Sequence, residues 1–275
     1  YRLCCHAKST ETSKKYKSQT HKPFEYFNSP EMEDKRDKVL SGTKLPECYT
    51  CYKQEEVNPD GESFRQRKLK QYSYELPTHV DKVNLKLRIN GSYCNLSCYM
   101  CIPYDSTTRL KSIHSEEVKG EKVFSDYAKA PIELVKGEKL KNVVDQIVEL
   151  APYIYNLKFI GGEPLVMKDF YMLLDKICKT GHADKMFVKY QTNMSVLSME
   201  RLRLLDYIPK FMQFEFTVSL DGIGKSVEYI RRRTNWQDVV NNIKEVKKFP
   251  NVTVNINGAI SFLSVLRFYE LIEWI

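Results

Sequence analysis

The chain has 275 residues, of which 42% are hydrophobic, so it can bury a core in one large domain or two modest ones. No run of 18 apolar residues occurs in the sequence, and we expect no membrane-spanning helix. The formal net charge is +8, but Lys and Arg alternate with Asp and Glu along most helical segments, which is typical of a solvated surface. We therefore do not expect a membrane or a nucleic acid as a partner.

Eight cysteines, most of them in two tight groups, favour metal binding in a reducing compartment, and we expect a cytoplasmic protein. The chain begins at Tyr1 and not at Met, and it ends at Ile275 within a helical pattern. We interpret it as a fragment of a longer protein that is cut at both ends, so the absence of a signal peptide carries little weight.

Residues 1–81 form a polar segment that is rich in Lys, Tyr, Ser and Glu and short of core-forming residues. Ser29 followed by Pro30 predicts the start of a helix, which Gly42 should end. A segment with so few apolar residues needs another source of stability, and a bound metal supplies one. Its cysteines are the candidate ligands: Cys4, Cys5, Cys48 and Cys51.

From residue 82 onward, strand-like and helix-like patterns alternate. Strands are predicted over residues 83–89, 155–160, 185–190, 213–220 and 252–260. Helices are predicted over residues 140–150, 169–179, 198–207, 236–249 and 263–275. Residues 102–132 show no clear period, so we expect an irregular insertion with at most short helices.

Five strands, each followed by a loop or a helix, predict an α/β fold with a parallel sheet and right-handed crossovers. Alternation alone does not distinguish an open doubly wound sheet from a barrel. No Gly-x-Gly-x-x-Gly pattern follows the first strand, which argues against a dinucleotide-binding sheet.

Cys94, Cys98 and Cys101 follow the first predicted strand, with three and then two residues between them. Inside a cell, three thiols this close together are more typical of metal ligands than of disulfides. Three protein ligands also leave one coordination position open for chemistry, whereas structural zinc, the main alternative, normally takes four. A buried thiol stripe on one helix face is a further alternative, although such stripes favour Leu and Ile.

Polar clusters also follow the next three strands: Gly161-Gly162-Glu163, Thr192-Asn193, and Ser219 with Asp221-Gly222. Because the carboxyl ends of parallel strands form one face, we expect these clusters to meet the three cysteines there. Two glycines allow a backbone to approach a ligand closely, and Glu163 can accept hydrogen bonds from an ammonium group. Each cluster taken alone also fits an ordinary turn or strand end.

Together these residues resemble the radical S-adenosylmethionine enzymes. Cys94-x3-Cys98-x2-Cys101 has the spacing of the family's cluster-binding loop, Gly161-Gly162-Glu163 looks like its second-strand motif, and Ser219-Leu220-Asp221-Gly222 is similar to a later strand end. The resemblance covers roughly residues 82–275. It implies that the core of this chain is the family's partial (β/α)6 barrel, which is TIM-like in form. The chain holds five of the six strands.

The resemblance implies that Cys94, Cys98 and Cys101 hold a [4Fe–4S] cluster with one iron free for S-adenosylmethionine. One electron would then cleave that molecule to methionine and a 5′-deoxyadenosyl radical, which abstracts hydrogen from a substrate. It further implies a reducing electron donor of the flavodoxin or ferredoxin type. Since similar proteins often modify peptides, we expect a peptide or protein side chain as the substrate, with small carbohydrate-like or nucleotide substrates as the alternatives.

Residue roles in binding S-adenosylmethionine follow from the same resemblance. Glu163, in the Gly161-Gly162-Glu163 motif, would bind the methionine ammonium group, and Asn193 and Ser219 would bind the ribose or nearby polar atoms, with Asp221 beside them. Arg231 is the candidate for the methionine carboxylate, because a guanidinium matches a carboxylate bidentately; Arg232 and Arg233 are its neighbouring alternatives. The family usually has an aromatic residue before the third cysteine, but here Met100 stands there and can pack on adenine through its thioether.

The segment around Cys48-x2-Cys51 looks like the SPASM or twitch modules of this superfamily, which hold an auxiliary iron–sulfur cluster. Residues 1–81 are therefore predicted to be such a module, placed before the barrel of residues 82–275. Its ligands would be Cys48, Cys51, Cys4 and either Cys5 or a residue upstream of this fragment. A zinc knuckle on the same cysteines is the alternative.

A hypothesis from another class is a zinc-containing nucleic-acid-binding protein, motivated by the paired cysteines and the positive charge. It leaves Gly161-Gly162-Glu163 without a role. No basic stripe interleaved with aromatic residues is evident in the sequence either.

Overall fold

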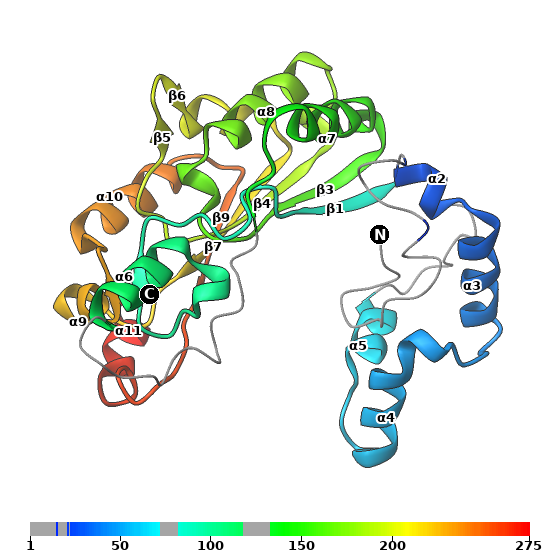
Figure 1. Ribbon diagram of the computed structural model, residues 1–275, viewed down its shortest axis with the longest axis horizontal. Helices are drawn as coiled ribbons and strands as arrows, with labels where there is room; N and C mark the ends of the chain where they lie inside the picture. The colour runs from blue at the N-terminus through cyan, green and yellow to red at the C-terminus, as the bar shows by residue number, and fades with distance from the viewer. Residues whose placement is uncertain (1–14, 16–20, 22, 72–81, 118–132) are drawn as a thin grey trace. The chain divides into compact units, whose positions relative to one another are not determined.

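The computed structural model describes residues 15, 21, 23–71, 82–117 and 133–275. The chain divides into two compact units, residues 1–81 and residues 82–275 (Figure 1). Cys4 and Cys5, two predicted ligands of the auxiliary cluster, lie outside the described residues.

The first unit is helical where it is described. Its elements are α2 (Pro23–Phe27), α3 (Pro30–Leu40), the short 3-10 helix η1 (Pro46–Cys48), α4 (Tyr49–Val57) and α5 (Phe64–Gln71). The predicted start of α3 is confirmed, since Ser29 Oγ accepts a hydrogen bond from the backbone N–H of Met32 at 3.3 Å.

Few apolar side chains are buried in this unit, and Tyr26 and Met32 form a small cluster with Phe27 against it. Polar contacts also stabilise the unit: Glu55 accepts a hydrogen bond from Ser63 Oγ at 2.5 Å and forms an ion pair with Arg65 at 2.7 Å. Caps and ion pairs around a small core therefore hold the described part of this unit, and the stabilising metal that its composition led us to expect stays a prediction.

The second unit is built on a parallel sheet of five strands. These are β1 (Val83–Leu87), β3 (Ile154–Phe159), β4 (Phe187–Thr192), β7 (Gln213–Ser219) and β9 (Val252–Asn257), and they pair in that order. Every pairing between neighbours is parallel, which confirms the predicted sheet. Because all five strands run in the same direction, their carboxyl ends emerge along one edge.

Helices lie in the connections between the strands, among them α7 (Gly137–Glu149), α8 (Lys168–Lys179), α9 (Gly224–Ile230) and α10 (Trp236–Val246). Helix α11 (Phe268–Trp274) follows β9. In Figure 1, α7 and α8 lie side by side against the sheet, and Lys176 of α8 pairs with Asp145 of α7 at 3.1 Å. The apolar side chains of α8 that recur at helical spacing are fully buried: Phe170, Leu173, Leu174 and Ile177.

Aromatic rings from adjacent strands stack in the core. Tyr190 of β4 lies with its ring centroid 4.7 Å from that of Phe159 on β3 and 5.9 Å from that of Phe216 on β7. All three side chains are at most 1% exposed. This packing fixes the register of the strands whose ends carry the candidate site.

The predicted helix over residues 198–207 is wrong. The segment forms a hairpin of β5 (Ser198–Met199) and β6 (Leu202–Arg203), followed by the 3-10 helix η7 (Leu204–Asp206). Glu200 has a φ of 54° at the turn, which a helix does not allow. Leu204 is fully buried, and its burial favours the hairpin even though the segment has a propensity to form a helix.

The insertion over residues 102–132 is more regular than predicted. After the 3-10 helix η2 (Pro103–Asp105) comes α6 (Thr107–Glu117), which has 11 residues, while residues 118–132 lie outside the described part. Ser106 caps α6, since its Oγ accepts from the backbone N–H of Arg109 at 3.1 Å. The last predicted helix is shorter than expected, with the 3-10 helix η9 (Val265–Arg267) leading into α11.

In the described segments, no helix combines the length and the apolar character that crossing a membrane requires.

Candidate functional site

The cysteine loop is attached to a segment far away in the sequence. β2 (Ser97–Cys98) pairs antiparallel with β8 (Arg231–Arg232), so that Cys98 lies opposite Arg231. The backbone N–H of Tyr99 donates to the carbonyl of Ile230 at 3.0 Å, and that of Cys101 donates to Cys98 at 3.1 Å. These backbone bonds hold the loop in one conformation.

Helix α6 holds the same loop from another side. Thr108 Oγ1 donates to the carbonyl of Cys94 at 2.5 Å, and Ser106 Oγ donates to the carbonyl of Leu96 at 3.1 Å. The hydroxyls of Ser97 and Ser112 lie 2.8 Å apart. The insertion that looked irregular in sequence therefore supports the cysteine loop through three side chains.

Cys94, Cys98, Cys101 and Cys178 are free thiols. Burial, and to a smaller extent the neighbouring thiols, raise the pKa of Cys94 to about 12 and that of Cys101 to about 11. Burial also raises the pKa of Cys98, although Arg231 opposes it. Thiolates form here only when a positively charged group such as a metal compensates them.

No three His, Cys, Asp or Glu side chains within the described ranges surround the position of a single metal ion. The three thiols of the loop thus do not converge on one point. A [4Fe–4S] cluster attaches each thiolate to a different iron and does not require such convergence.

The Gly161-Gly162 pair lies directly against the segment that leads into the cysteine loop. Gly161 has a φ of 116°, which favours glycine, and a Cβ on Gly162 would overlap the carbonyl of Tyr93. The backbone N–H of Glu163 donates to that same carbonyl at 2.8 Å. We predicted that the glycines permit close approach to a ligand; the close approach that the structure shows is to the chain's own backbone.

Glu163 is a buried carboxylate at the end of β3, only 1% exposed. Its Oε1 accepts hydrogen bonds from Leu165 N at 3.0 Å and Thr192 Oγ1 at 2.8 Å, and its Oε2 accepts from Asn193 N at 2.6 Å. Burial raises the pKa of this carboxyl to about 7, although the three hydrogen bonds act to lower it. The residues after β3 and β4 are thereby joined, as predicted for strand ends on one face.

Asn193 continues this network to the cysteine loop. Its Nδ2 donates to Asn95 Oδ1 at 2.9 Å, and its Oδ1 accepts from Ser195 N at 2.9 Å. Asn95 Nδ2 in turn donates to Ser195 Oγ at 2.9 Å. Asn95 and Ser195 were not among the predicted site residues, and their only sequence signal is their position inside the two loops.

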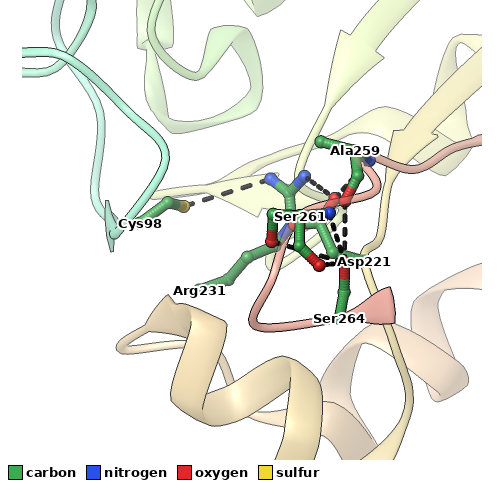
Figure 2. Close-up of polar contacts among 6 residues, drawn as sticks. All are labelled: Cys98, Asp221, Arg231, Ala259, Ser261 and Ser264. Atoms are coloured by element: carbon green, nitrogen blue, oxygen red, sulfur yellow. Dashed lines mark hydrogen bonds and ion pairs between the residues drawn. The ribbon is translucent and has the colours of Figure 1, made fainter. Parts of the chain in front are cut away.

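Asp221 and Arg231 form a buried ion pair beside the loop (Figure 2). Asp221 is fully buried, Arg231 Nε lies 2.8 Å from its Oδ2, and Arg231 Nη2 donates to its Oδ1 at 3.0 Å. Arg231 Nη1 lies 4.0 Å from Cys98 Sγ. The pair therefore links the end of β7 to the cysteine loop.

Asp221 also fixes the segment after β9. Its Oδ1 accepts from the backbone N–H of Ala259 at 2.7 Å, and Ser264 Oγ donates to the carbonyl of Ala259 at 3.0 Å (Figure 2).

Two further predicted site residues are partly accessible. Ser219, the last residue of β7, is half-buried, and Met100 in the cysteine loop is 37% exposed.

The remaining predicted ligands belong to the first unit. Cys48 ends η1 and is half-buried, and Cys51 lies in the first turn of α4 and is 5% exposed. Cys178, outside both cysteine groups, is a half-buried thiol on α8.

Comparison with known proteins identifies the family. Residues 91–260 match the Radical SAM superfamily, which comprises the radical S-adenosylmethionine enzymes, and the chain belongs to it. The chain is also similar to Molybdenum cofactor biosynthesis protein 1 of Dictyostelium discoideum, with 26% identity over 194 residues. That match covers 68% of this chain but 26% of the relative, so the chain spans about a quarter of the length of that protein.

The predicted membership in this superfamily is confirmed, and with it an enzyme whose class works with a [4Fe–4S] cluster and S-adenosylmethionine. The site fits these groups, because one loop presents three free thiols, of which Cys98 is buried and Cys94 and Cys101 are half-buried. A buried carboxylate stands on the neighbouring strand end, joined to that loop through Asn193. These are the donor types that an iron–sulfur cluster and an amino acid group bind.

Proposed function

We propose that Cys94, Cys98 and Cys101 hold a [4Fe–4S] cluster at which S-adenosylmethionine is cleaved reductively, so that a substrate loses a hydrogen atom. The observation that carries this proposal is one continuous network. Glu163 bonds to Tyr93 before the cysteine loop and to Asn193 after β4, and Asn193 bonds to Asn95 inside the loop. Three motifs separated in sequence are thereby fixed in one place, which a catalytic site requires.

When bound, the cluster supplies the electron that breaks a carbon–sulfur bond of S-adenosylmethionine to give methionine and a 5′-deoxyadenosyl radical. The chain's own residues would orient that molecule. Glu163 is assigned to the methionine ammonium group: a carboxylate offers about four acceptor positions, and three of them are used inside the protein. The remaining position and the negative charge suit one ammonium N–H.

Asn193 and Ser219 are assigned to the ribose or nearby polar atoms, and Met100 to adenine. Asn193 keeps one amide hydrogen and one lone pair beyond the contacts to Asn95 and Ser195. Met100 is exposed enough to contact a ligand ring. These assignments use the groups that the network leaves available.

Arg231 is assigned to the methionine carboxylate. Its Nε and Nη2 face Asp221, so the bidentate contact that we expected would compete with that ion pair. Nη1, on the side toward Cys98, is the donor through which a carboxylate would bind. Asp221 then serves to hold the guanidinium in place.

We further propose that the five-stranded sheet belongs to a (β/α)6 barrel and that residues 1–81 form a SPASM/twitch-like module with an auxiliary iron–sulfur cluster. Cys48 and Cys51, three residues apart at the start of α4, support the second assignment because such spacing places two thiols on one side of a helical turn. Cys4 and either Cys5 or a residue upstream would complete the ligands.

The substrate class that we propose is a peptide or protein side chain, and the electron donor is a reducing protein of the flavodoxin or ferredoxin type. The free thiols of Cys94, Cys98 and Cys101 fit a reducing compartment such as the cytoplasm. The name of the Dictyostelium relative points instead to a small cofactor precursor, which is the second candidate class. Deuterium transfer from a deuterated peptide pool into 5′-deoxyadenosine would support the first class, and transfer only from deuterated nucleotides would contradict it.

Anaerobic reconstitution followed by iron and sulfide analysis tests the cluster assignments. Alanine at Cys98 should remove the iron of the core site and leave the auxiliary site loaded, and alanine at Cys51 should do the reverse. Cys178→Ala is the matched control and should bind as much iron as the wild type. Colourless protein with stoichiometric zinc would contradict the proposal.

A further inference from the structure

Arg109 is a buried arginine whose charge the described part of the protein leaves unpaired. It lies in the first turn of α6 and is 8% exposed, and its Nε and Nη1 have no hydrogen-bond partner among the described residues. Among the described residues, no carboxylate forms an ion pair with it. Burying a cation without a counter-charge is costly, so such a group calls for a source of negative charge.

The surroundings of Arg109 are the cysteine loop itself. Its guanidinium carbon lies 5.5 Å from the ring centroid of Tyr99, which stands between Cys98 and Cys101 in the chain. The residue before it, Thr108, bonds to the carbonyl of Cys94. Arg109 is also among the charges that lower the pKa of Cys101, against the larger effect of burial.

An aromatic face attracts a cation, but this attraction alone does not replace a counter-charge in a buried site. Arg232 offers a comparison within the same structure. Its guanidinium lies 5.6 Å from the centroid of the same Tyr99 ring, yet its side chain is only half-buried. Arg109 is therefore the more deeply buried of the two cations beside this ring.

We propose that Arg109 is a positioning residue that balances the negative charge of the loaded cysteine loop and thereby raises the reduction potential of the cluster bound there. The inference rests on the proposed function, because it requires a cluster on the three cysteines. Each thiolate of the loop brings one negative charge, and the external reductant adds one electron when the cluster is reduced. A fixed cation in a site of low dielectric constant favours the more negative, reduced state.

The test is an anaerobic redox titration of the full-length chain, followed by electron paramagnetic resonance. It monitors the signal that disappears in Cys98→Ala, so that an auxiliary cluster does not interfere. At a fixed potential, Arg109→Met should lower the ratio of reduced to oxidised cluster at least tenfold, which corresponds to about 59 mV for a one-electron couple. Arg109→Lys keeps the charge, so its ratio of reduced to oxidised cluster should differ from that of the wild type by less than about threefold. That limit is well below the tenfold effect expected for Arg109→Met.

Arg232→Met is the matched control, since it removes a cation at the same distance from Tyr99 but from a less buried position. It should change the ratio by less than about threefold on the same scale. An unchanged potential in Arg109→Met would overturn the inference. So would an equal shift in Arg232→Met, because the effect would then reflect total charge and not the buried guanidinium.

Thermal unfolding of the cluster-free chain covers the case in which Arg109→Met binds no cluster. A melting temperature at or above that of the wild type supports the inference, because the guanidinium is then needed only when the loop is loaded. A large drop would overturn it and assign Arg109 a structural role. If the wild type itself binds no cluster at the three cysteines, the proposed function fails, which is a separate and recognisable result.

Discussion

Replacing Glu163 with glutamine tests the electrostatics of the candidate site in the cluster-free protein. The substitution keeps the size of the side chain but removes its charge and one of its acceptor oxygens. The structure surrounds that carboxylate with three donors while excluding water from it. The variant should therefore change how stability depends on pH.

The pKa of Glu163 is raised from 4.5 to about 7, mainly by burial. A carboxyl with a raised pKa binds a proton more tightly in the folded state, so its contribution to stability is complete below pH 4.5. That contribution is lost as the pH rises from 4.5 to about 7. With 1.36 kcal/mol for each unit, the loss is roughly 3 kcal/mol over this window.

Urea unfolding at a series of pH values measures this effect through tryptophan fluorescence. Both tryptophans, Trp236 and Trp274, belong to the unit of residues 82–275, with ring centroids 5.0 Å apart, so the signal reports on that unit. Glu163→Gln should lack the extra fall in stability that the wild type shows between pH 4.5 and 7. Glu245→Gln, at an exposed ion pair on α10, is the control and should retain it. Equal pH profiles for the wild type and Glu163→Gln would refute the reasoning.

Two further substitutions test the packing of the site by the same unfolding assay. Gly162→Ala places a methyl group against the Tyr93 carbonyl and should lower the free energy of unfolding by about 2 kcal/mol. The control is Gly224→Ala, at a position with a φ of 51° and open space around it, which should lower it by only about 1 kcal/mol. Equal losses in the two variants would contradict the steric argument. Asp221→Asn leaves Arg231 buried without its counter-charge and should cost about 3 kcal/mol. Combining Asp221→Leu with Arg231→Met should recover part of that loss, and a fully additive loss would argue against the ion pair.

Much of the core unit was predictable from the sequence because its patterns are local. The alternation of apolar residues in β7 (Gln213–Ser219) and the inward stripe of α8 are periodicities that burial imposes directly. The hairpin around Glu200 was not predictable in this way, since its left-handed turn depends on how the following Leu204 is buried. Local propensity does not contain that information.

Short elements that pair over long distances were also missed. β2 and β8 have two residues each, and Cys98 pairs with Arg231 across most of the unit, so no sequence window shows either strand. Helix α6 was missed as well, since the helix lacks a strong apolar stripe and its cap, Ser106, is recognised only from its hydrogen bond to Arg109. Its role in holding the cysteine loop emerges only in three dimensions.

In the candidate site, too, some features could be predicted from the sequence and others appear only in the fold. The spacing of the three cysteines and the Gly-Gly-Glu motif identified the superfamily, because residue types at fixed intervals carry the cluster chemistry. The unpaired charge of Arg109 and the link from Asn193 to Asn95 depend on where separate loops meet. Such contacts are properties of the fold, which spacing does not express.

The central claim is that the loaded cysteine loop cleaves S-adenosylmethionine by one-electron reduction. The direct measurement is to reconstitute the chain anaerobically, add dithionite and S-adenosylmethionine, and quantify 5′-deoxyadenosine and methionine. The wild-type protein should form both products, and Cys98→Ala, which lacks one of the three thiolates, should form neither. Wild-type protein that carries iron and sulfide at the core site and yet forms neither product would contradict it.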